Sequence, residues 1–437
     1  MKKIILSAAV AAMAFSTAAL ADDKGIDVVT SGQAVVYYQT NITDATGQPD
    51  LFDQSASSAN VGLQLNLNAD LKNNFSFGTQ LTYLGTAGLE KNLVSGVRQS
   101  VGSPTGMTNA GDEIAITKIY IAKKIGNTTA KIGRQELPKS LSPFAYSEGW
   151  NVFKNTFEAI LLVNTDIPNT TVVGAYVGQS NKHANLGTFT DLTPGAQGVA
   201  APAGNVAVDG AAYMLTVQNK SIPMTTVTVS YYDVSNVRAD SNASVGVRDI
   251  SFEGANALWA DVAVAGKDLP AGLKIGLQGG TITTENSGLA DTTAMGVKVF
   301  ASPVKGLTVG AAYTSVDGDD NKAQVAVKNF GTGVKSPLYT QMVANQNAIS
   351  LDADTIQLKA VYGMGDMGTI IAQGTQTTAG KSNLVGSEVD FTDLELLYKL
   401  KAGGVNYLLA YVNTNTDPAT GNGVNTDIIR FWARYNF

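Results

Sequence analysis

The end of the chain constrains its fold more than any other segment. Residues 428–437 read IIRFWARYNF, and every second residue in this stretch is apolar or aromatic: Ile429, Phe431, Ala433, Tyr435 and Phe437. The positions between them include two guanidinium groups, Arg430 and Arg434. A period of two is typical of a β-strand with two unlike faces. We therefore predict that the chain ends in a strand with one wholly apolar face and one cationic face.

The same alternation is clearest between residues 61 and 71. Val61, Leu63, Leu65 and Leu67 lie on one face, whereas Gln64, Asn66, Asn68 and Asp70 lie on the other. A soluble protein would turn the apolar set toward a core, but a membrane barrel would turn it toward lipid and the amides toward a water-filled lumen. The short polar segment 72–74 leads into a second alternating run at 75–83, which predicts a hairpin.

The N-terminus has the features of an export signal. Lys2 and Lys3 make residues 1–3 a basic n-region, residues 4–20 are largely apolar and rich in alanine, and Ala19-Leu20-Ala21 matches a signal-peptidase cleavage pattern. The apolar run is short and rich in Ala and Ser, which favours a cleaved signal over a permanent membrane anchor. We predict a signal peptide at 1–21 and a single mature domain at 22–437.

The composition excludes several classes of protein. The 36 acidic residues outnumber the 30 basic ones, which argues against a general nucleic-acid binder. The absence of cysteine excludes disulfides and thiolate metal sites. After residue 21, no stretch approaches the roughly 18 continuous apolar residues of a spanning helix. A transmembrane barrel fits, because each of its strands needs only about ten alternating residues.

Turn signals and alternating runs predict eighteen strands in the mature chain, with sixteen as the alternative. The expected fold is all-β: a transmembrane, antiparallel, up-and-down β-barrel in which short turns alternate with long loops. An even number of strands places both termini on the periplasmic side with the short turns, and the long loops outside the cell. No linker rich in proline, serine or charge divides the chain, so we expect one domain.

One long connection, residues 134–156, differs from the others in mixing both charges with aromatic residues. Its charged residues are Arg134, Glu136, Lys139, Glu148 and Lys154, and Glu158 follows it. Two prolines, Pro138 and Pro143, would fix its path. Segment 133–163, with the strand pair before it, resembles the corresponding region of the campylobacterial major outer-membrane porins. These are similar in turn to the substrate-specific channels of pseudomonads.

The resemblance is strongest across residues 110–180 and at the two termini. It implies an eighteen-stranded homotrimeric barrel of a Gram-negative outer membrane that passes small hydrophilic solutes. Carried over by position, the resemblance implies that five residues line a pore constriction: Arg134, Glu136, Lys139, Glu148 and Lys154. The alternative is that these are solvated loop charges. The terminal strand resembles the signal read by the barrel-assembly machinery, which assigns that role to Phe431, Tyr435 and Phe437.

The phase of the strands predicts further lumen charges. If Leu63 faces lipid, Asp70 faces water. A Lys or Arg on the lipid side of a barrel costs about 2–4 kcal/mol at the bilayer midplane. The same logic therefore turns four more residues inward: Lys131, Lys359, Arg430 and Arg434. Such a lining has both signs with a basic component, and it would set ion preference by electrostatics and pore width.

The sequence offers little for catalysis or metal binding. His183, the only histidine, lies in a predicted surface loop, which disfavours a His-based triad or a zinc site. Asp317 and Asp319 mimic calcium-loop positions, but Lys322 and Lys328 stand where the turn glycine and the bidentate glutamate belong. We therefore expect no enzyme activity and no cofactor, and at most a weak surface ion site at Asp317 and Asp319.

The sequence thus predicts an outer-membrane porin for passive diffusion of ions and small hydrophilic solutes, surrounded by outer-membrane lipid. The alternative is an outer-membrane barrel that serves as an adhesin or surface structural protein.

Overall fold

A computed structural model describes residues 26–437 apart from 45–46, 102–112, 183, 193–195, 198–205, 209, 236, 240–253, 286–288, 318–322, 381–387 and 419–421. The predicted signal peptide, His183 and Asp319 lie outside the described residues. No helix in the described part of the chain is long and apolar enough to cross a membrane.

Eighteen strands form the wall of a closed barrel. They are β1 (Asp27–Thr43), β2 (Ser57–Lys72), β3 (Phe75–Gly85), β4 (Glu113–Ile125), β5 (Thr128–Gln135), β6 (Phe157–Asn164), β7 (Thr170–Lys182), β11 (Ala212–Asn219), β12 (Thr225–Ser235), β14 (Gly254–Ala265), β15 (Lys274–Thr284), β17 (Thr292–Val304), β18 (Leu307–Val316), β20 (Ala353–Gly363), β21 (Thr369–Ala379), β22 (Val389–Ala402), β23 (Val405–Pro418) and β24 (Val424–Asn436).

Short elements lie in the connections between wall strands. The strands among them are β8 (Asn185–Asp191), β9 (Ala196–Gln197), β10 (Val206–Val208), β13 (Val237–Ala239), β16 (Leu289–Ala290) and β19 (Ala323–Val325). The helical turns are η1 (Gln54–Ala56), η2 (Leu89–Lys91), α2 (Gln346–Ile349), η4 (Pro270–Gly272) and η5 (Gly365–Met367).

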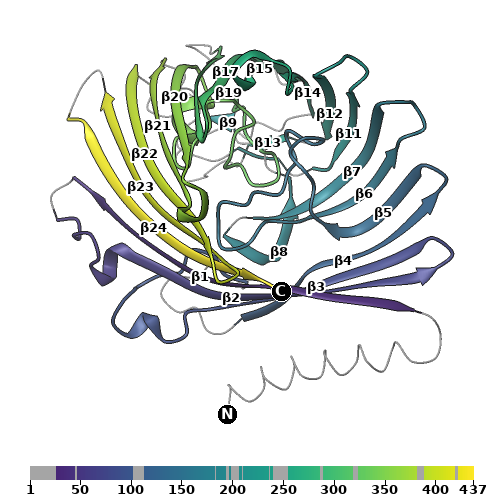
Figure 1. The fold of residues 1–437 in the computed structure, drawn as a ribbon, viewed down its shortest axis with the longest axis horizontal. Helices are drawn as coiled ribbons and strands as arrows, with labels where there is room; N and C mark the ends of the chain where they lie inside the picture. The colour runs from purple at the N-terminus through teal and green to yellow at the C-terminus, as the bar shows by residue number, and fades with distance from the viewer. Residues whose placement is uncertain are drawn as a thin grey trace.

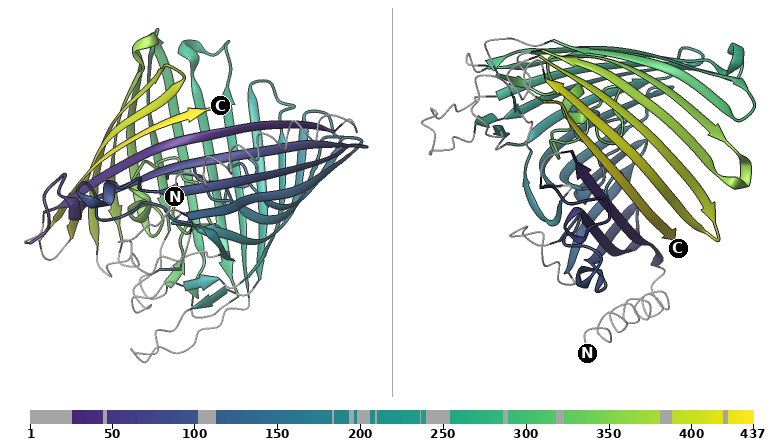
Figure 2. Two further views of the ribbon diagram at one scale, coloured as in Figure 1. Left: turned by 90° about the horizontal axis from the view of Figure 1, so that it is seen from below. Right: turned by 90° about the vertical axis from the view of Figure 1, so that its left-hand side faces the viewer.

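Each wall strand pairs antiparallel with its neighbour in chain order, and β24 pairs with β1 to close the ring. Figure 1 shows this order as a continuous change of colour around the ring, with the yellow β24 beside the purple β1. Figure 2 shows the strands tilted together along the wall. The predicted antiparallel barrel is confirmed with eighteen strands, and the alternative of sixteen is wrong.

The two faces of the wall differ as the alternation predicts. On β17, Met295 is 59% exposed on the outer face, and Val297 and Val299 share that face. Lys298, between them, points into the barrel, where its ammonium contacts Tyr339. An apolar outer face and a polar inner face are the pattern of a barrel embedded in lipid.

The largest buried apolar clusters lie inside the ring. Long connections enter it, among them the β5–β6 loop (residues 136–156) and the β18–β20 loop (residues 317–352). Phe144 of the first and Phe330 of the second share one cluster with Tyr232 and Trp259 of the wall. In Figure 1 the blue-green and green traces of these loops cross the inside of the ring. The core of this protein is therefore made between loops and the inner wall.

Closure depends on a close approach at the chain end. The backbone N–H of Gly32 donates to the Phe437 carbonyl at 2.7 Å, and the Phe437 N–H donates to the Gly32 carbonyl at 3.0 Å. The Phe437 ring lies against Gly32, where an added Cβ would come within 2.3 Å of the ring and 2.7 Å of the Gln64 carbonyl oxygen. Glycine at residue 32 therefore makes room for the terminal aromatic ring.

We predict that Gly32→Ala weakens barrel closure. The new methyl group meets both the Phe437 ring and a backbone oxygen that cannot move away, and overpacking of this kind costs about 1–3 kcal/mol. The measurement is the midpoint of the heat-induced mobility shift of folded protein in gel electrophoresis. Gly174→Ala is the matched control, because an added Cβ on Gly174 meets nothing within 4 Å. Equal midpoints for the two variants would contradict this account.

Candidate channel constriction

The β5–β6 loop lies inside the barrel and is fixed there by aromatic contacts. The Phe144 ring stacks on Phe330 with centroids 4.8 Å apart and an interplanar angle of 9°. It also meets Trp259 edge-on at 5.3 Å and Tyr232 at 5.7 Å. Because Tyr232 and Trp259 belong to the wall strands β12 and β14, the loop is anchored to the wall and to the second loop at once.

Glu148 joins the two loops through hydrogen bonds. One carboxylate oxygen accepts from Trp150 Nε1 at 2.6 Å. The other accepts from Asn329 Nδ2 at 2.8 Å, from the Lys335 N–H at 3.1 Å and from the Thr332 hydroxyl. Glu148 was predicted as a constriction charge, but it is buried and surrounded by donors. Its charge holds the loops together and is not presented to water.

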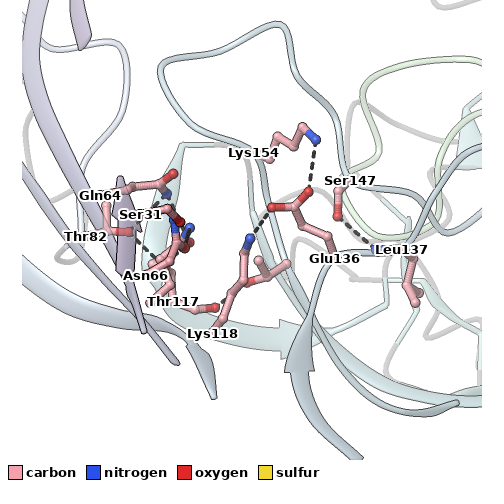
Figure 3. A network of polar contacts seen from close by, with 12 residues as sticks. Ser31, Gln64, Asn66, Thr82, Thr117, Lys118, Glu136, Leu137, Ser147 and Lys154 are labelled. Atoms are coloured by element: carbon pink, nitrogen blue, oxygen red, sulfur yellow. Dashed lines mark hydrogen bonds and ion pairs between the residues drawn. The ribbon is translucent and has the colours of Figure 1, made fainter. Parts of the chain in front are cut away.

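Glu136 bridges two lysines on the inner side of the wall, as Figure 3 shows. Its carboxylate pairs with Lys118 of β4 and, at 2.9 Å, with Lys154 at the other end of the loop. Burial favours the neutral acid, but the two ammonium groups outweigh it and hold the pKa of Glu136 below its usual value. The Lys154 side chain remains half exposed, so this triad carries a net positive charge that water reaches.

The triad faces a row of neutral polar groups on the neighbouring strands. Gln64 Nε2 donates to Gln80 Oε1 and to the Thr82 hydroxyl, both at 3.1 Å, and Gln80 Nε2 donates to Asn66 Oδ1 at 2.8 Å. The labelled members of this row lie beside the triad in Figure 3. The amides on the polar face of β2 therefore line the same interior as Glu136.

Lys139 lies inside the barrel but away from that triad. Its ammonium donates to the Ser336 carbonyl at 3.1 Å and lies 5.1 Å from the centre of the Tyr146 ring. Burial and, second to it, the charge of Lys298 lower the pKa of Lys139 to about 8.

Arg134 corrects the predicted constriction. Its guanidinium pairs with Glu158 at 2.7 Å and stacks on Phe189 at 4.2 Å. Its strand partner is Ile119, which like Ile132 is an exposed apolar residue of the outer face. Period-two alternation places Lys131 and Gly133 inward and Arg134 outward, so Arg134 lies on the outer surface and the prediction that it lines the constriction is wrong.

Of the other predicted lining residues, Lys131 and Lys359 lie on the inner face of the wall and Asp70 lies at a turn. Lys131 lies inside, with its ammonium 3.6 Å from the centre of the Tyr120 ring. On β20, Lys359 shares the inner face with the buried Gln357, and Leu358 between them is exposed on the outer face. Asp70 is at the short-turn end of β2, where its carboxylate accepts the Lys72 N–H at 2.8 Å. Asp70 therefore caps a turn at the rim.

Arg430 and Arg434 lie on the inner face of the closing strand. Arg430 donates from Nε and Nη2 to Gln39 Oε1 at 3.1 and 3.0 Å. Arg434 donates to the Asn151 carbonyl at 2.5 Å and stacks on Trp432 at 4.5 Å. Phe431, Tyr435 and Phe437 alternate with them on the exposed outer face.

Three cations surround the Trp150 ring of the β5–β6 loop. Lys335 lies 5.0 Å, Arg98 5.2 Å and Arg430 5.8 Å from its centre. Burial is the main cause that lowers the pKa of Lys335, to about 7, and the charges of Arg430 and Arg98 act in the same direction. The loop and the closing strand therefore meet in a strongly basic region.

Lys118, Arg98 and Lys335 were not predicted. Lys118 sits beside a bulge, because Gln80 pairs with Lys118 but Leu81 pairs with Ile116. The bulge places both Thr117 and Lys118 inward and interrupts the alternation that would have identified the lysine. Arg98 and Lys335 are in long connections, where strand phase gives no signal.

Within the described residues, no group of three or more His, Asp or Glu side chains is placed to hold a metal ion. Asp317 uses its backbone N–H to donate to the Thr293 carbonyl at 2.8 Å and its carbonyl to accept from Gln324 at 2.6 Å. The first contact fastens the start of the β18–β20 loop to the wall strand β17, and the second is made within the loop.

We predict that Glu148→Gln loosens the two inward loops. The new amide N–H₂ group needs hydrogen-bond acceptors, but the groups around it are donors. A buried donor left unsatisfied costs about 1–3 kcal/mol. The expected result is a noisier and larger single-channel current in planar bilayers. Glu158→Gln is the matched control: it removes the same charge ten positions away, on the outer face, and should leave the current unchanged. A changed current in Glu158→Gln and not in Glu148→Gln would contradict the assigned faces.

The chain is similar to known proteins in part of its sequence and in its fold. Residues 1–216 match the family model described as the Campylobacter major outer membrane protein. No curated protein matches the chain in sequence. The predicted resemblance to campylobacterial porins is confirmed.

Solved structures share the fold over nearly the whole chain. OccK8 (OprE) of Pseudomonas aeruginosa is 15% identical, with a TM-score of 0.70 over 94% of this chain and 98% of that one. OccAB3 of Acinetobacter baumannii is 12% identical, with a TM-score of 0.69 over 94% and 100%. OpdK of P. aeruginosa, solved with vanillate, is 12% identical, with a TM-score of 0.66 over 93% and 98%. At these identities the likeness concerns the fold.

Proposed function

We propose that this outer-membrane porin, whose residues 1–216 match the family model of the Campylobacter major outer membrane protein, conducts ions and small hydrophilic solutes through a constriction to which two loops contribute. The observation that carries the proposal is the joint docking of the β5–β6 and β18–β20 loops inside the barrel, through Phe144, Phe330 and Glu148. These loops narrow the lumen and leave its charged groups at defined positions.

Passage through such a lumen requires no covalent chemistry. A solute leaves bulk water, exchanges part of its hydration for the amides of β2 and the charges of the triad, and leaves on the other side. Selectivity follows from pore width and from the sign of the lining charge. Water-accessible Lys154 and the inward-facing Arg434 outnumber Glu136 among these groups, so the channel should favour anions.

The cellular setting follows from the same proposal. We propose that residues 1–21 are removed as a signal peptide on export, and that Phe431, Tyr435 and Phe437 present an apolar strand face to the barrel-assembly machinery. We also propose a homotrimer surrounded by outer-membrane lipid, an expectation that rests on the resemblance to the porin family. The adhesin alternative is not favoured, because the matching family and the fold are those of channels.

The first test is conduction itself. Purified, folded protein added to planar bilayers should produce stepwise current increases in potassium chloride, because a water-filled lumen conducts ions. Silent bilayers, obtained from protein that still shows the heat-induced mobility shift of a folded barrel, would overturn the proposed function.

A second prediction concerns ion preference. Replacing Arg430 and Arg434 together with Gln should shift the reversal potential in a potassium chloride gradient toward cation preference, because two inward positive charges are lost. Glu136→Gln should shift it the opposite way. Lys305→Gln, in the short turn between β17 and β18, is the control, because that turn lies outside the constriction. Unchanged reversal potentials in both test variants would show that these charges do not face the ion path.

A further inference from the structure

The outside of the wall has a recess of about 920 Å³ where β5 and β6 end. These two strands have 8 residues each, whereas β4 and β7 on either side of them have 13. Figure 1 shows the four strands side by side in the wall. Because the β5–β6 loop turns into the barrel, it does not continue the wall beyond its own strands. The inward loop therefore leaves a recess on the outside, which faces away from the lumen.

The recess opens on the face that carries the exposed apolar residues. Ile119 of β4, Ile132 of β5 and Ile160 of β6 line it, and each is between 42 and 51% exposed. Gly133 has a φ of 123°, and an added Cβ there would lie 2.2 Å from the Ile119 carbonyl oxygen. Glycine at residue 133 therefore allows β4 and β5 to approach closely. Apolar side chains exposed on the outside of a membrane barrel contact acyl chains.

Tyrosines mark the height of the recess in the membrane. Tyr176 lines it, and Tyr213 is the register partner of Tyr176 on β11, with the two rings 5.4 Å apart. Both tyrosines are exposed on the outer face, and Tyr213 is the second residue of β11, at the end next to the long loop. Aromatic girdles lie where the acyl chains meet the headgroups. The recess therefore reaches the headgroup boundary on the long-loop side of the barrel.

A row of polar residues crosses the long-loop end of the recess. The row consists of Arg134 on β5, Glu158 on β6, Gln179 on β7 and Asp191 on β8, each the register partner of the next. All four residues line the recess. Along the row one positive charge is followed by a negative, a neutral and a negative group. The row therefore presents a cation at one end and two carboxylates beside it.

The Arg134 guanidinium is held in place but keeps an open edge. Its Nε donates to Glu158 Oε1 at 2.7 Å, and its Nη1 donates to the Ile116 carbonyl at 3.1 Å. The group also stacks on Phe189 at 4.2 Å. In the described part of the chain, Arg134 Nη2 and Glu158 Oε2 make no hydrogen bond, and the two side chains are 33% and 37% exposed. The pair therefore offers a donor and an acceptor side by side.

We propose that the recess binds a membrane lipid whose headgroup carries phosphoethanolamine. The phosphate accepts from Arg134 Nη2, the primary ammonium donates to Glu158 Oε2 and to Asp191, and an acyl chain lies against Ile132 and Ile160. Charge selects this headgroup. The two carboxylates repel an anionic headgroup that has no ammonium, and a quaternary ammonium has no hydrogen to donate to them. The site lies outside the ion path and is separate from conduction.

The test is lipid retention, measured by native mass spectrometry of folded protein in detergent. The probes are phosphatidylethanolamine, phosphatidylcholine and phosphatidylglycerol with identical acyl chains. The wild-type protein should retain phosphatidylethanolamine about tenfold more strongly than either of the others, the equivalent of about 1.4 kcal/mol. This comparison needs no variant, and equal retention of the three lipids would overturn the proposal.

Two variants locate the site. Arg134→Gln removes the phosphate partner and should weaken retention of phosphatidylethanolamine about tenfold. Glu158→Gln removes an ammonium partner and should reduce the preference for phosphatidylethanolamine over phosphatidylcholine. The matched controls are Lys123→Gln on β4 and Asp354→Asn on β20, which each remove one charge from a wall strand outside the recess and should change neither quantity. An equal effect of Arg134→Gln and Lys123→Gln would rule out this site.

Three further outcomes bear on the occupant and the face. Soluble phosphoethanolamine should not displace the lipid at equal concentration, because it has no acyl chain, and displacement would overturn a lipid occupant. Phosphatidylethanolamine that stays on single chains but is absent from an oligomer would show that a second copy covers the recess, which also overturns the proposal. Conduction by Arg134→Gln should match the wild type, and a changed current would place Arg134 in the ion path and overturn the outer site.

Discussion

The structure depends on the requirement that no backbone N–H or C=O group remain unpaired in hydrocarbon. An open sheet cannot meet it, because each edge strand presents a row of unpaired groups. The pairing of β1 with β24 removes both edges, with Val35 opposite Arg434 and Gly32 bonded to Phe437 in both directions. The outward-facing residues then need only be apolar, which explains how a chain of low hydropathy can be stable in lipid.

Closure with eighteen strands has a consequence for the inside. Barrels of about this size are too wide for wall side chains to fill and leave an aqueous channel. Here the β5–β6 and β18–β20 loops occupy part of that space. They are fastened by an aromatic cluster around Phe144 and by the buried carboxylate of Glu148, which accepts hydrogen bonds from both loops. These hydrogen bonds are directional, so they fix the relative orientation of the two loops, which aromatic contacts alone would not fix.

Loop docking also divides the interior electrostatically. Glu136 sits between two lysines against the β4 wall, Trp150 sits among cations beside the closing strand, and Lys139 and Lys298 line a cavity beside β14, β15 and β17. Each region carries more positive than negative charge, although the whole chain is acidic with a net charge of −6. A solute inside therefore meets a field opposite in sign to that of the chain as a whole, which is why the overall charge says little about ion preference.

The strand positions could be predicted because alternation is a local property. A residue's face is fixed by its immediate neighbours, so the inward direction of Arg430 and Arg434 follows from ten residues of sequence. The same rule places Arg134 outward, since Lys131 is inward; grouping Arg134 with the charged loop that follows it led to the wrong face. The alternation did not predict that Lys118 faces inward, because a bulge at Thr117 shifts the phase of the alternation by one residue. A single sequence carries no signal for that shift.

The sequence by itself determined the two-faced strands, their order and the aromatic strand that closes the ring. Only the tertiary structure decided which long connections enter the lumen and which charges meet there. The contacts responsible join residues far apart in the chain: Asn329 bonds to Tyr146 across 183 positions, and Lys139 to Ser336 across 197. No periodic signal links such residues, because their meeting depends on the curvature of a closed wall and on the space it encloses.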